Sequence, residues 1–457
     1  MNAPDGFSAT SLAAERQRLL DDFRRVRAVT IGLAEPLSPE DCQAQSMPDA
    51  SPVKWHLAHT TWFFETFLLR EFVPAYAPAS PQYRVLFNSY YNAVGDKHPR
   101  PQRGLLTRPT LAEVLDYRRH VDEAMAAAIA DGAAGGSAAF RDLLVLGLNH
   151  EQQHQELILT DIKHLLSCNP TGPAYASPAI ATRHRQAPAQ EAVIRGDEAA
   201  EMPARFRRFD GGIVDVGHDG FGFCFDNELP AHQVLLQPFE LAERLVTCAE
   251  YLGFVRDGGY RRPELWLSLG WDRIQAEGWS LPLYWRYSRG TEAAEGPGPI
   301  EHFTLAGWQP VEPAAPVAHL SFFEADAFAR WAGCRLPTET EWEHAAIRTP
   351  AGSEANLLER GLLRPLPARP GESLMQMWGD LWEWTSSAYL PYPGFRTSAG
   401  AVGEYNGKFM CNQFVLRGGS FATSLSHIRA SYRNFFPPEA RWQFSGLRLA
   451  RDARRPG

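Results

Sequence analysis

The 457-residue chain changes its sequence pattern near residue 205. Before that point, apolar residues recur at a spacing of three to four over long stretches, a pattern typical of amphipathic helices. After it, eleven of the 13 Trp residues occur among glycines, prolines and short apolar runs. This division predicts a helical N-terminal domain followed by a domain that mixes helices and strands around an aromatic core.

The N-terminal part predicts four long amphipathic helices, which would pack as an antiparallel bundle with side chains meeting in its interior. Ser51 and Pro52 have the form of an N-cap followed by a first-turn proline. The four predicted helical segments are 11–33, 53–72, 111–131 and 139–167.

The chain therefore divides into a helical bundle (1–168), a linker or strap rich in Pro and Ala (169–205) and a loop-rich α+β domain (206–457). In the last domain, two helices are predicted, and two short apolar stretches are candidate strands. The predicted helices are 246–256 and 321–332, and the candidate strands lie in 211–217 and 232–241.

Composition and charge exclude several classes of function. The net charge is −8, whereas non-specific binding of nucleic acids needs a basic surface. No apolar run approaches the roughly 20 residues that span a bilayer, and the N-terminus lacks the features of a secretory signal. The six cysteines are scattered without a CxxC motif, which favours reduced thiols in a cytoplasmic protein.

Histidines carry the strongest chemical signal. In the segment NHEQQHQEL, His150 and His154 lie four residues apart, so their side chains are separated by only about 40° around the helix. A neutral imidazole offers a lone pair near pH 7. The segment WHLAHTTWFF adds His56 and His59 among bulky apolar residues. Either of them could complete a metal site with the pair, since the two segments belong to one bundle.

The same segment also matches the H-E-x-x-H pattern, in which two histidines bind zinc and the glutamate acts as the general base of a metalloprotease. Glu151 would be that base. The pattern then needs a third ligand downstream. His164 is the nearest candidate, and its spacing from His154 does not match the longer protease pattern.

Motifs along nearly the whole chain resemble the sulfoxide synthases of ergothioneine biosynthesis, also called hercynine oxygenases. SPVKWHLAHTTWFFE and NHEQQHQELILTD resemble a DinB-like four-helix bundle. RLPTETEWEHAA, GDLWEWTSSAY, VLRGGSFAT and FSGLRLARD resemble the C-type-lectin-like fold of the formylglycine-generating, or sulfatase-modifying, enzymes. The order of these motifs makes the resemblance specific.

The resemblance implies an iron(II)- and O₂-dependent enzyme of the cytoplasm. Such enzymes join the sulfur of cysteine or γ-glutamylcysteine to the imidazole of trimethylhistidine (hercynine) and oxidise that sulfur to a sulfoxide. It also implies that His59, rather than His56, ligates iron together with His150 and His154. Three neutral imidazoles leave coordination positions for a substrate thiolate and O₂.

The segment FNSYYNAVGDKHPRPQRGLLTRPT supplies further candidates. Arg100 and Arg103 present planar guanidinium forks that match a carboxylate, and the resemblance implies that they hold the thiol substrate. Arg108 is a weaker candidate. Tyr90 and Tyr91 keep their phenolic protons at neutral pH and are predicted proton donors. Tyr405 is a reserve candidate, because some members of the family use a tyrosine of the C-terminal domain.

Trimethylhistidine needs aromatic faces for its quaternary ammonium group. SYRNFFPPEARWQFSG supplies Asn434, Phe435 and Phe436 for this role. Phe436 stands where part of the family has an aspartate that positions the γ-glutamyl group, so free cysteine is the expected thiol. Gln153 is predicted to bind the substrate imidazole.

The expected active site lies between the two domains, and its partners are small molecules rather than a membrane or nucleic acid. Three alternatives remain open beside the metalloprotease. A formylglycine-generating oxidase needs reactive cysteines near its C-terminal end, where Cys411 stands alone. An ovothiol-type synthase carries an added methyltransferase domain. A non-catalytic ligand-binding protein would use the histidines structurally. The sequence leaves the oligomeric state open, a homo-oligomer included.

Overall fold

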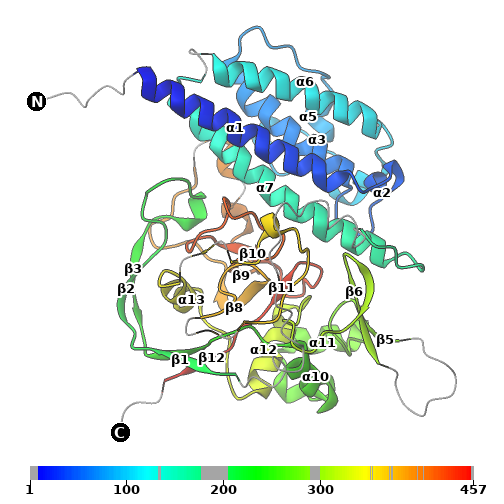
Figure 1. Cartoon of the computed structure of the whole chain (residues 1–457), viewed down its shortest axis with the longest axis vertical. Coiled ribbons are helices and arrows are strands. Elements are labelled where there is room, and N and C mark those ends of the chain that lie inside the picture. The colour runs from blue at the N-terminus through cyan, green and yellow to red at the C-terminus, as the bar shows by residue number, and fades with distance from the viewer. Residues whose placement is uncertain are drawn as a thin grey trace, which may run out of the picture. The chain divides into compact units, whose positions relative to one another are not determined.

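The chain forms two compact units in the computed structural model (Figure 1). The first comprises Met1–Leu165 and Gly400–Glu404, and the second comprises Leu166–Ala399 and Tyr405–Gly457. The structure describes residues 9–131, 135–175, 204–288, 299–349, 351–352, 354–369, 371, 374–398, 400–404 and 406–453.

Four long helices build the first unit, as the apolar periodicity predicts (Figure 1). The second long helix passes through a π-helical turn, Glu65–Leu69, into α4 (Arg70–Phe72). Shorter helices, α2 and α5, lie in the connections. The bounds are α1 (Ala9–Ala34), α2 (Pro39–Gln43), α3 (Val53–Phe64), α5 (Tyr83–Leu86), α6 (Leu111–Ala130) and α7 (Ala138–Ser167).

Helix α3 is the central helix of this unit, because every residue from Val53 to Phe64 is buried. It packs against both α6 and α1. A helix that is buried all round must satisfy its polar side chains within the protein. The histidines of α3 are therefore held by contacts with neighbouring elements rather than by water.

The predicted N-cap of α3 is wrong. Pro52 occupies the position before the helix, and no side chain caps it. The hydroxyl of Ser51 instead accepts a hydrogen bond from Arg103 at 2.9 Å, and its backbone N–H donates to Asp161 at 2.7 Å. Ser51 thus joins two distant segments instead of starting a helix.

Short strands in four sheets form the framework of the described part of the second unit. Their orders are β1-β4-β12, β10-β9-β8-β11, β2-β3 and β5-β6-β7. The bounds are β1 (Phe206–Phe209), β2 (Gly212–Val216), β3 (His232–Leu236), β4 (Phe239–Ala242), β5 (Trp285–Tyr287), β6 (Ile300–Thr304), β7 (Gly307–Pro310), β8 (Trp382–Ala388), β9 (Phe414–Arg417), β10 (Asn434–Phe436), β11 (Ser445–Gly446) and β12 (Ala450–Asp452).

The two predicted helices of the second unit are confirmed as α10 (Cys248–Arg256) and α12 (Phe322–Trp331). Two further helices were not predicted, α11 (Ser268–Glu277) and α13 (Glu339–Ala346). Helix α13 follows a capping box in which Thr338 and Glu341 bond to each other's backbone N–H groups. This T-x-x-E signature was present in the sequence, but the short charged helix lacks a long apolar stripe.

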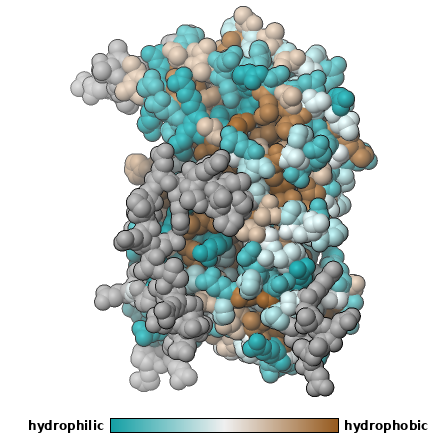
Figure 2. Space-filling view, turned by 45° about the vertical axis from the view of Figure 1, so that its right-hand side comes forward, coloured by the Kyte–Doolittle hydropathy of each residue, from teal (hydrophilic) through white to brown (hydrophobic). Residues whose placement is uncertain are grey.

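Aromatic and ionic contacts hold the core of the second unit. Trp342 and Trp384 are fully buried, and Arg448 forms an equally buried ion pair with Glu383. On the face shown in Figure 2, hydrophobic residues form patches separated by hydrophilic ones. Among the described helices, none combines the length and apolar character needed to cross a membrane.

Candidate metal centre

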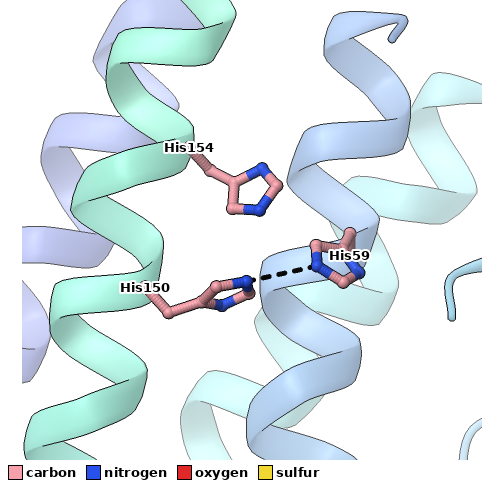
Figure 3. Close-up of side chains that lie close together, drawn as sticks. All are labelled: His59, His150 and His154. Atoms are coloured by element: carbon pink, nitrogen blue, oxygen red, sulfur yellow. Dashed lines mark hydrogen bonds between the residues drawn. The ribbon is translucent and has the colours of Figure 1, made fainter. Parts of the chain in front are cut away.

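Three buried histidines from two helices of the first unit point toward one another (Figure 3). Helix α3 supplies His59, and α7 supplies His150 and His154 from adjacent turns. One ring nitrogen from each residue lies within 4.8 Å of the other two. The spacing within α7 thus presents both imidazoles to the same point on α3.

Hydrogen bonding determines which ring nitrogen of His59 keeps a lone pair for metal binding. Its Nδ1 lies 2.6 Å from the carbonyl oxygen of Phe87, which can only accept, so Nδ1 carries the proton. Its Nε2 therefore keeps a lone pair and lies 3.3 Å from Nε2 of His150. The other nitrogen of His150 is buried and has no hydrogen-bond partner among the described residues.

The separation of these two nitrogens suits a shared ion. Nitrogens about 2.1 Å from a metal and at right angles around it lie about 3.0 Å apart. The observed 3.3 Å between His59 and His150 is close to that value. Nitrogen donors of this kind suit iron, zinc, copper and nickel. The donor set therefore fits a divalent transition metal.

Burial keeps all three imidazoles neutral. It lowers the pKa of His150 to about 4, and His56 adds to this effect while Glu151 opposes it. Burial and the neighbouring imidazoles hold the pKa values of His59 and His154 well below the ordinary value. At neutral pH the rings therefore offer lone pairs instead of positive charges.

Aromatic rings enclose the histidines. Trp55 stacks on His59 with 4.5 Å between ring centroids, and Trp62 lies 5.6 Å from the same imidazole. Phe63 lies 4.8 Å from the ring of His150. These rings restrict the imidazoles to narrow ranges of orientation and exclude water from their sides.

His56 lies beside this group rather than within it. Its Nδ1 is 2.8 Å from Nδ1 of His154, and its Nε2 is 3.1 Å from Oδ2 of Asp161. Of the two histidines that spacing alone left open, His59 is the one grouped with the pair on α7. Asp161 was not singled out from the sequence. It follows His150 by eleven residues, which returns it to the same helix face within about 20°.

Glu151 belongs to a buried ion-pair network and is not one of the grouped ligands. Its carboxylate accepts hydrogen bonds from Arg27 at 2.9 Å and from Arg118. Burial alone would raise its pKa, but the two arginines outweigh that effect and lower it to about 2. Such a carboxylate is a poor general base. His164 bonds to Ser46 instead of joining the group, so the geometry disfavours the metalloprotease.

Arg103 is buried against Trp55, the ring that stacks on His59. Its guanidinium carbon is 3.4 Å from the ring centroid of Trp55, and the group donates to Ser51. Burial, together with the charge of Arg100, lowers its pKa to about 9. The charge of Asp161 opposes this lowering. Arg100 donates to the hydroxyl of Tyr90 at 2.9 Å and to the carbonyl of Asp49.

Tyr91 is buried one aromatic ring away from the histidines. Its ring lies 5.7 Å from Trp62, which contacts His59, and 6.3 Å from Phe63, which contacts His150. The next two residues, Asn92 and Ala93, donate their backbone N–H groups to the carboxylate of Glu404. This anchor has no signature in the sequence, since no local pattern links positions so far apart.

Gln153 is half-buried on α7 next to His154, whereas Tyr405 lies outside the described residues. The residues expected to bind the trimethylammonium group form β10 of the second unit. Phe435 stacks on Tyr389 with a centroid separation of 4.1 Å. The other two, Asn434 and Phe436, are half-buried as well. That these residues face the histidines stays a prediction.

Each of the two units resembles a known protein family. Residues 22–158 match the DinB superfamily, and residues 191–360 and 370–453 match the sulfatase-modifying factor enzyme 1-like domain. The chain is 32% identical to the hercynine oxygenase of Mycobacterium tuberculosis, over 95% of this chain and 99% of that protein.

Two other relatives cover less of the chain. The formylglycine-generating enzyme of Streptomyces coelicolor is 30% identical over 54% of this chain and 88% of that enzyme. Ergothioneine biosynthesis protein 1 of Schizosaccharomyces pombe is 28% identical over 51% of this chain and 28% of that protein. Because the similarity to the mycobacterial enzyme runs through both units, the chain belongs to the hercynine oxygenase family.

Proposed function

We propose that this chain is an O₂-dependent sulfoxide synthase that joins trimethylhistidine to cysteine at an iron(II) centre held by His59, His150 and His154. The observation that carries the proposal is the convergence of three neutral, buried imidazoles in a member of the hercynine oxygenase family. Bound iron(II) would supply open coordination positions and the electrons for O₂ chemistry.

The overall reaction balances without a further reductant. Forming the carbon–sulfur bond removes one hydrogen from the imidazole carbon and one from the thiol, which is a two-electron oxidation. Converting the sulfur to a sulfoxide is a second two-electron oxidation. Together they reduce one O₂ by four electrons, so that one oxygen atom enters the product and the other leaves as water.

Arg103 is the proposed anchor for the carboxylate of the thiol substrate. A guanidinium that is 5% exposed loses most of its hydration, and Ser51 and Trp55 compensate for only part of that loss, since burial still lowers its pKa and its Nε has no hydrogen-bond partner among the described residues. A substrate carboxylate would supply the missing charge and accept two hydrogen bonds. Arg100, three residues earlier, is proposed to assist while it orients the phenol of Tyr90.

Tyr91 and Tyr90 are the proposed proton donors. Tyr91 has the more direct link to the centre, because its ring packs against both Trp62 and Phe63. The backbone bonds from Asn92 and Ala93 to Glu404 hold the segment that carries both phenols. A phenol held in place can give its proton to a developing oxyanion without solvent reorganisation.

Gln153 is proposed to bind the imidazole of trimethylhistidine, with Asn434, Phe435 and Phe436 around its quaternary ammonium group. Cation–π attraction to Phe435 and Phe436 would supply most of that recognition. A cytoplasmic location is also part of the proposal. None of the six cysteines, all of which lie among the described residues, forms a disulfide, which suits a reducing compartment.

Product mass spectrometry tests the proposed function. The protein is incubated with iron(II), O₂ and trimethylhistidine, together with either cysteine or γ-glutamylcysteine. The expected product with cysteine has the summed mass of the two substrates minus two hydrogens plus one oxygen. A faster reaction with γ-glutamylcysteine would correct the thiol, and the absence of any coupled product with either thiol would refute the function.

A further inference from the structure

Asp161, His56 and His154 form a continuous hydrogen-bonded series that ends at the candidate metal centre. Oδ2 of Asp161 lies 3.1 Å from Nε2 of His56, and Nδ1 of His56 lies 2.8 Å from Nδ1 of His154. All three side chains are at least nine-tenths buried. The series therefore has no access to bulk water along its length.

The direction of each hydrogen bond follows from the acid at the far end. Oδ2 of Asp161 accepts from the backbone N–H of Ser51, so it is an acceptor toward His56 as well, and Nε2 of His56 carries a proton and donates to it. A neutral imidazole has one N–H, so Nδ1 of His56 has a lone pair and accepts from Nδ1–H of His154. The proton of His154 is thereby placed on Nδ1, and its Nε2 keeps a lone pair that can bind a metal ion.

We propose that His56 and Asp161 are positioning residues that set the tautomer and ring orientation of His154 for metal binding. The inference rests on the proposed metal site, but it assigns a role to two residues outside the ligand set. The three histidines then differ in the hydrogen bonds that orient them. A backbone carbonyl orients His59, a side-chain pair orients His154, and the described residues supply no hydrogen bond to Nδ1 of His150.

Asp161 is itself held in place from a third segment. The backbone N–H of Ser51 donates to the same Oδ2 atom at 2.7 Å. Two donors thus converge on one oxygen and fix the carboxylate between α7 and the start of α3. Partners of this kind around metal-binding histidines change metal affinity by about 10- to 100-fold when they are removed.

The affinity of the metal-free protein for Co(II), measured by competition with a chelating indicator, tests this inference. His56→Leu removes both hydrogen bonds of the imidazole. His56→Gln is the conservative variant, because its amide can donate to Asp161 and accept from His154 in the same order. Asp161→Leu and Asp161→Asn form the equivalent pair. His164→Leu is the control, since it alters a half-buried histidine on the same helix that bonds to Ser46.

We expect both Leu variants to lose affinity by about 10- to 100-fold. The Gln and Asn variants should retain most of the affinity, and His164→Leu should match the wild type. The ligand-field absorption of bound Co(II) should change in His56→Leu, because His154 would no longer be held in one orientation. A purely structural role would lower the unfolding temperature without changing that spectrum.

Two outcomes would overturn the inference. One is that His56→Leu and Asp161→Leu bind Co(II) as tightly as the wild type, with the same spectrum. The other is that the control variant loses as much affinity as they do. A wild-type protein that is folded and binds neither Co(II) nor iron(II) would refute the metal site itself. If either Leu variant does not fold, the smaller changes His56→Asn, whose amide is too short to reach both partners, and Asp161→Ala take its place, and the same two outcomes decide.

Discussion

Nδ1–H of His59 donates to the backbone carbonyl oxygen of Phe87 at 2.6 Å. The orientation of this proposed ligand is therefore set by the path of the chain after α5, and no side-chain substitution at Phe87 removes the bond. The same bond leaves Nε2 of His59 as the nitrogen that faces His150. The fold therefore sets the orientation of His59 before any metal binds.

Acid should destabilise the metal-free protein. Folded His150 stays neutral down to its pKa of about 4, whereas the unfolded chain protonates it near 6.5. The unfolded state therefore binds more protons between these values, and stability falls as the pH falls through that window. For His150 alone the loss is about 3 kcal/mol. Urea unfolding of the metal-free protein at several pH values measures it.

The variant His150→Gln is the control for the pH prediction, since it cannot titrate in this range. Its unfolding free energy should depend less steeply on pH than that of the wild type. Identical pH profiles for the two proteins would contradict the assigned cause.

Replacing Arg103 should weaken use of the thiol substrate. Arg103→Leu removes a guanidinium proposed to make charge-assisted hydrogen bonds to the carboxylate, so kcat/KM for the thiol should fall by about 10- to 100-fold. Trimethylhistidine binding should change little. Arg119→Leu is the matched control, because Arg119 is exposed and pairs with Asp116 on the surface of α6. An effect on trimethylhistidine binding alone would reverse the proposed substrate orientation.

The tyrosine pair should control sulfoxide formation. Tyr91→Phe keeps the ring that packs against Trp62 and Phe63 but removes the proton donor. Loss of a positioned acid costs about 100-fold or more in rate. Tyr90→Phe also releases Arg100 from its hydroxyl partner. Sulfoxide yield per bound metal is the measurement, and full yield in both variants would rule out the role.

Glu151→Gln should separate stability from chemistry. It breaks a fully buried ion pair with Arg27 and Arg118, so the unfolding free energy should fall by about 3–5 kcal/mol. The folded, metal-loaded variant should still form sulfoxide, because this carboxylate is bound by two arginines and is not one of the grouped ligands. Asp122→Asn is a milder comparison, since Asp122 shares Arg27 but is partly exposed. Loss of turnover in stable, metal-loaded Glu151→Gln would restore Glu151 as a candidate base.

The sequence predicts those features that depend on neighbours along the chain. The four bundle helices follow from apolar periodicity, and the common face of His150 and His154 follows from their spacing. Asp161 lies on the same helix face, eleven residues after His150. Its role could not be predicted, because it depends on a contact with His56 on another helix. The role of Ser51 was misread because its hydrogen bonds go to Arg103 and Asp161.

The second unit was harder to predict. Its short helices α11 and α13 have too few turns for a clear apolar stripe, and packing against neighbouring elements stabilises them instead. Helix α13, for example, contacts β2, β8 and β9. Such contacts join residues that are distant along the chain, as α13 and β2 are, and no local pattern records them.

Counting the metal bound per chain tests the central claim most directly. Metal-free protein is titrated anaerobically with iron(II), and bound iron is measured in the wild type and in His59→Ala, His150→Ala and His154→Ala. The account predicts one tightly bound iron per wild-type chain and loss of that binding in each variant. A folded His154→Ala protein that binds one iron with wild-type affinity would contradict it.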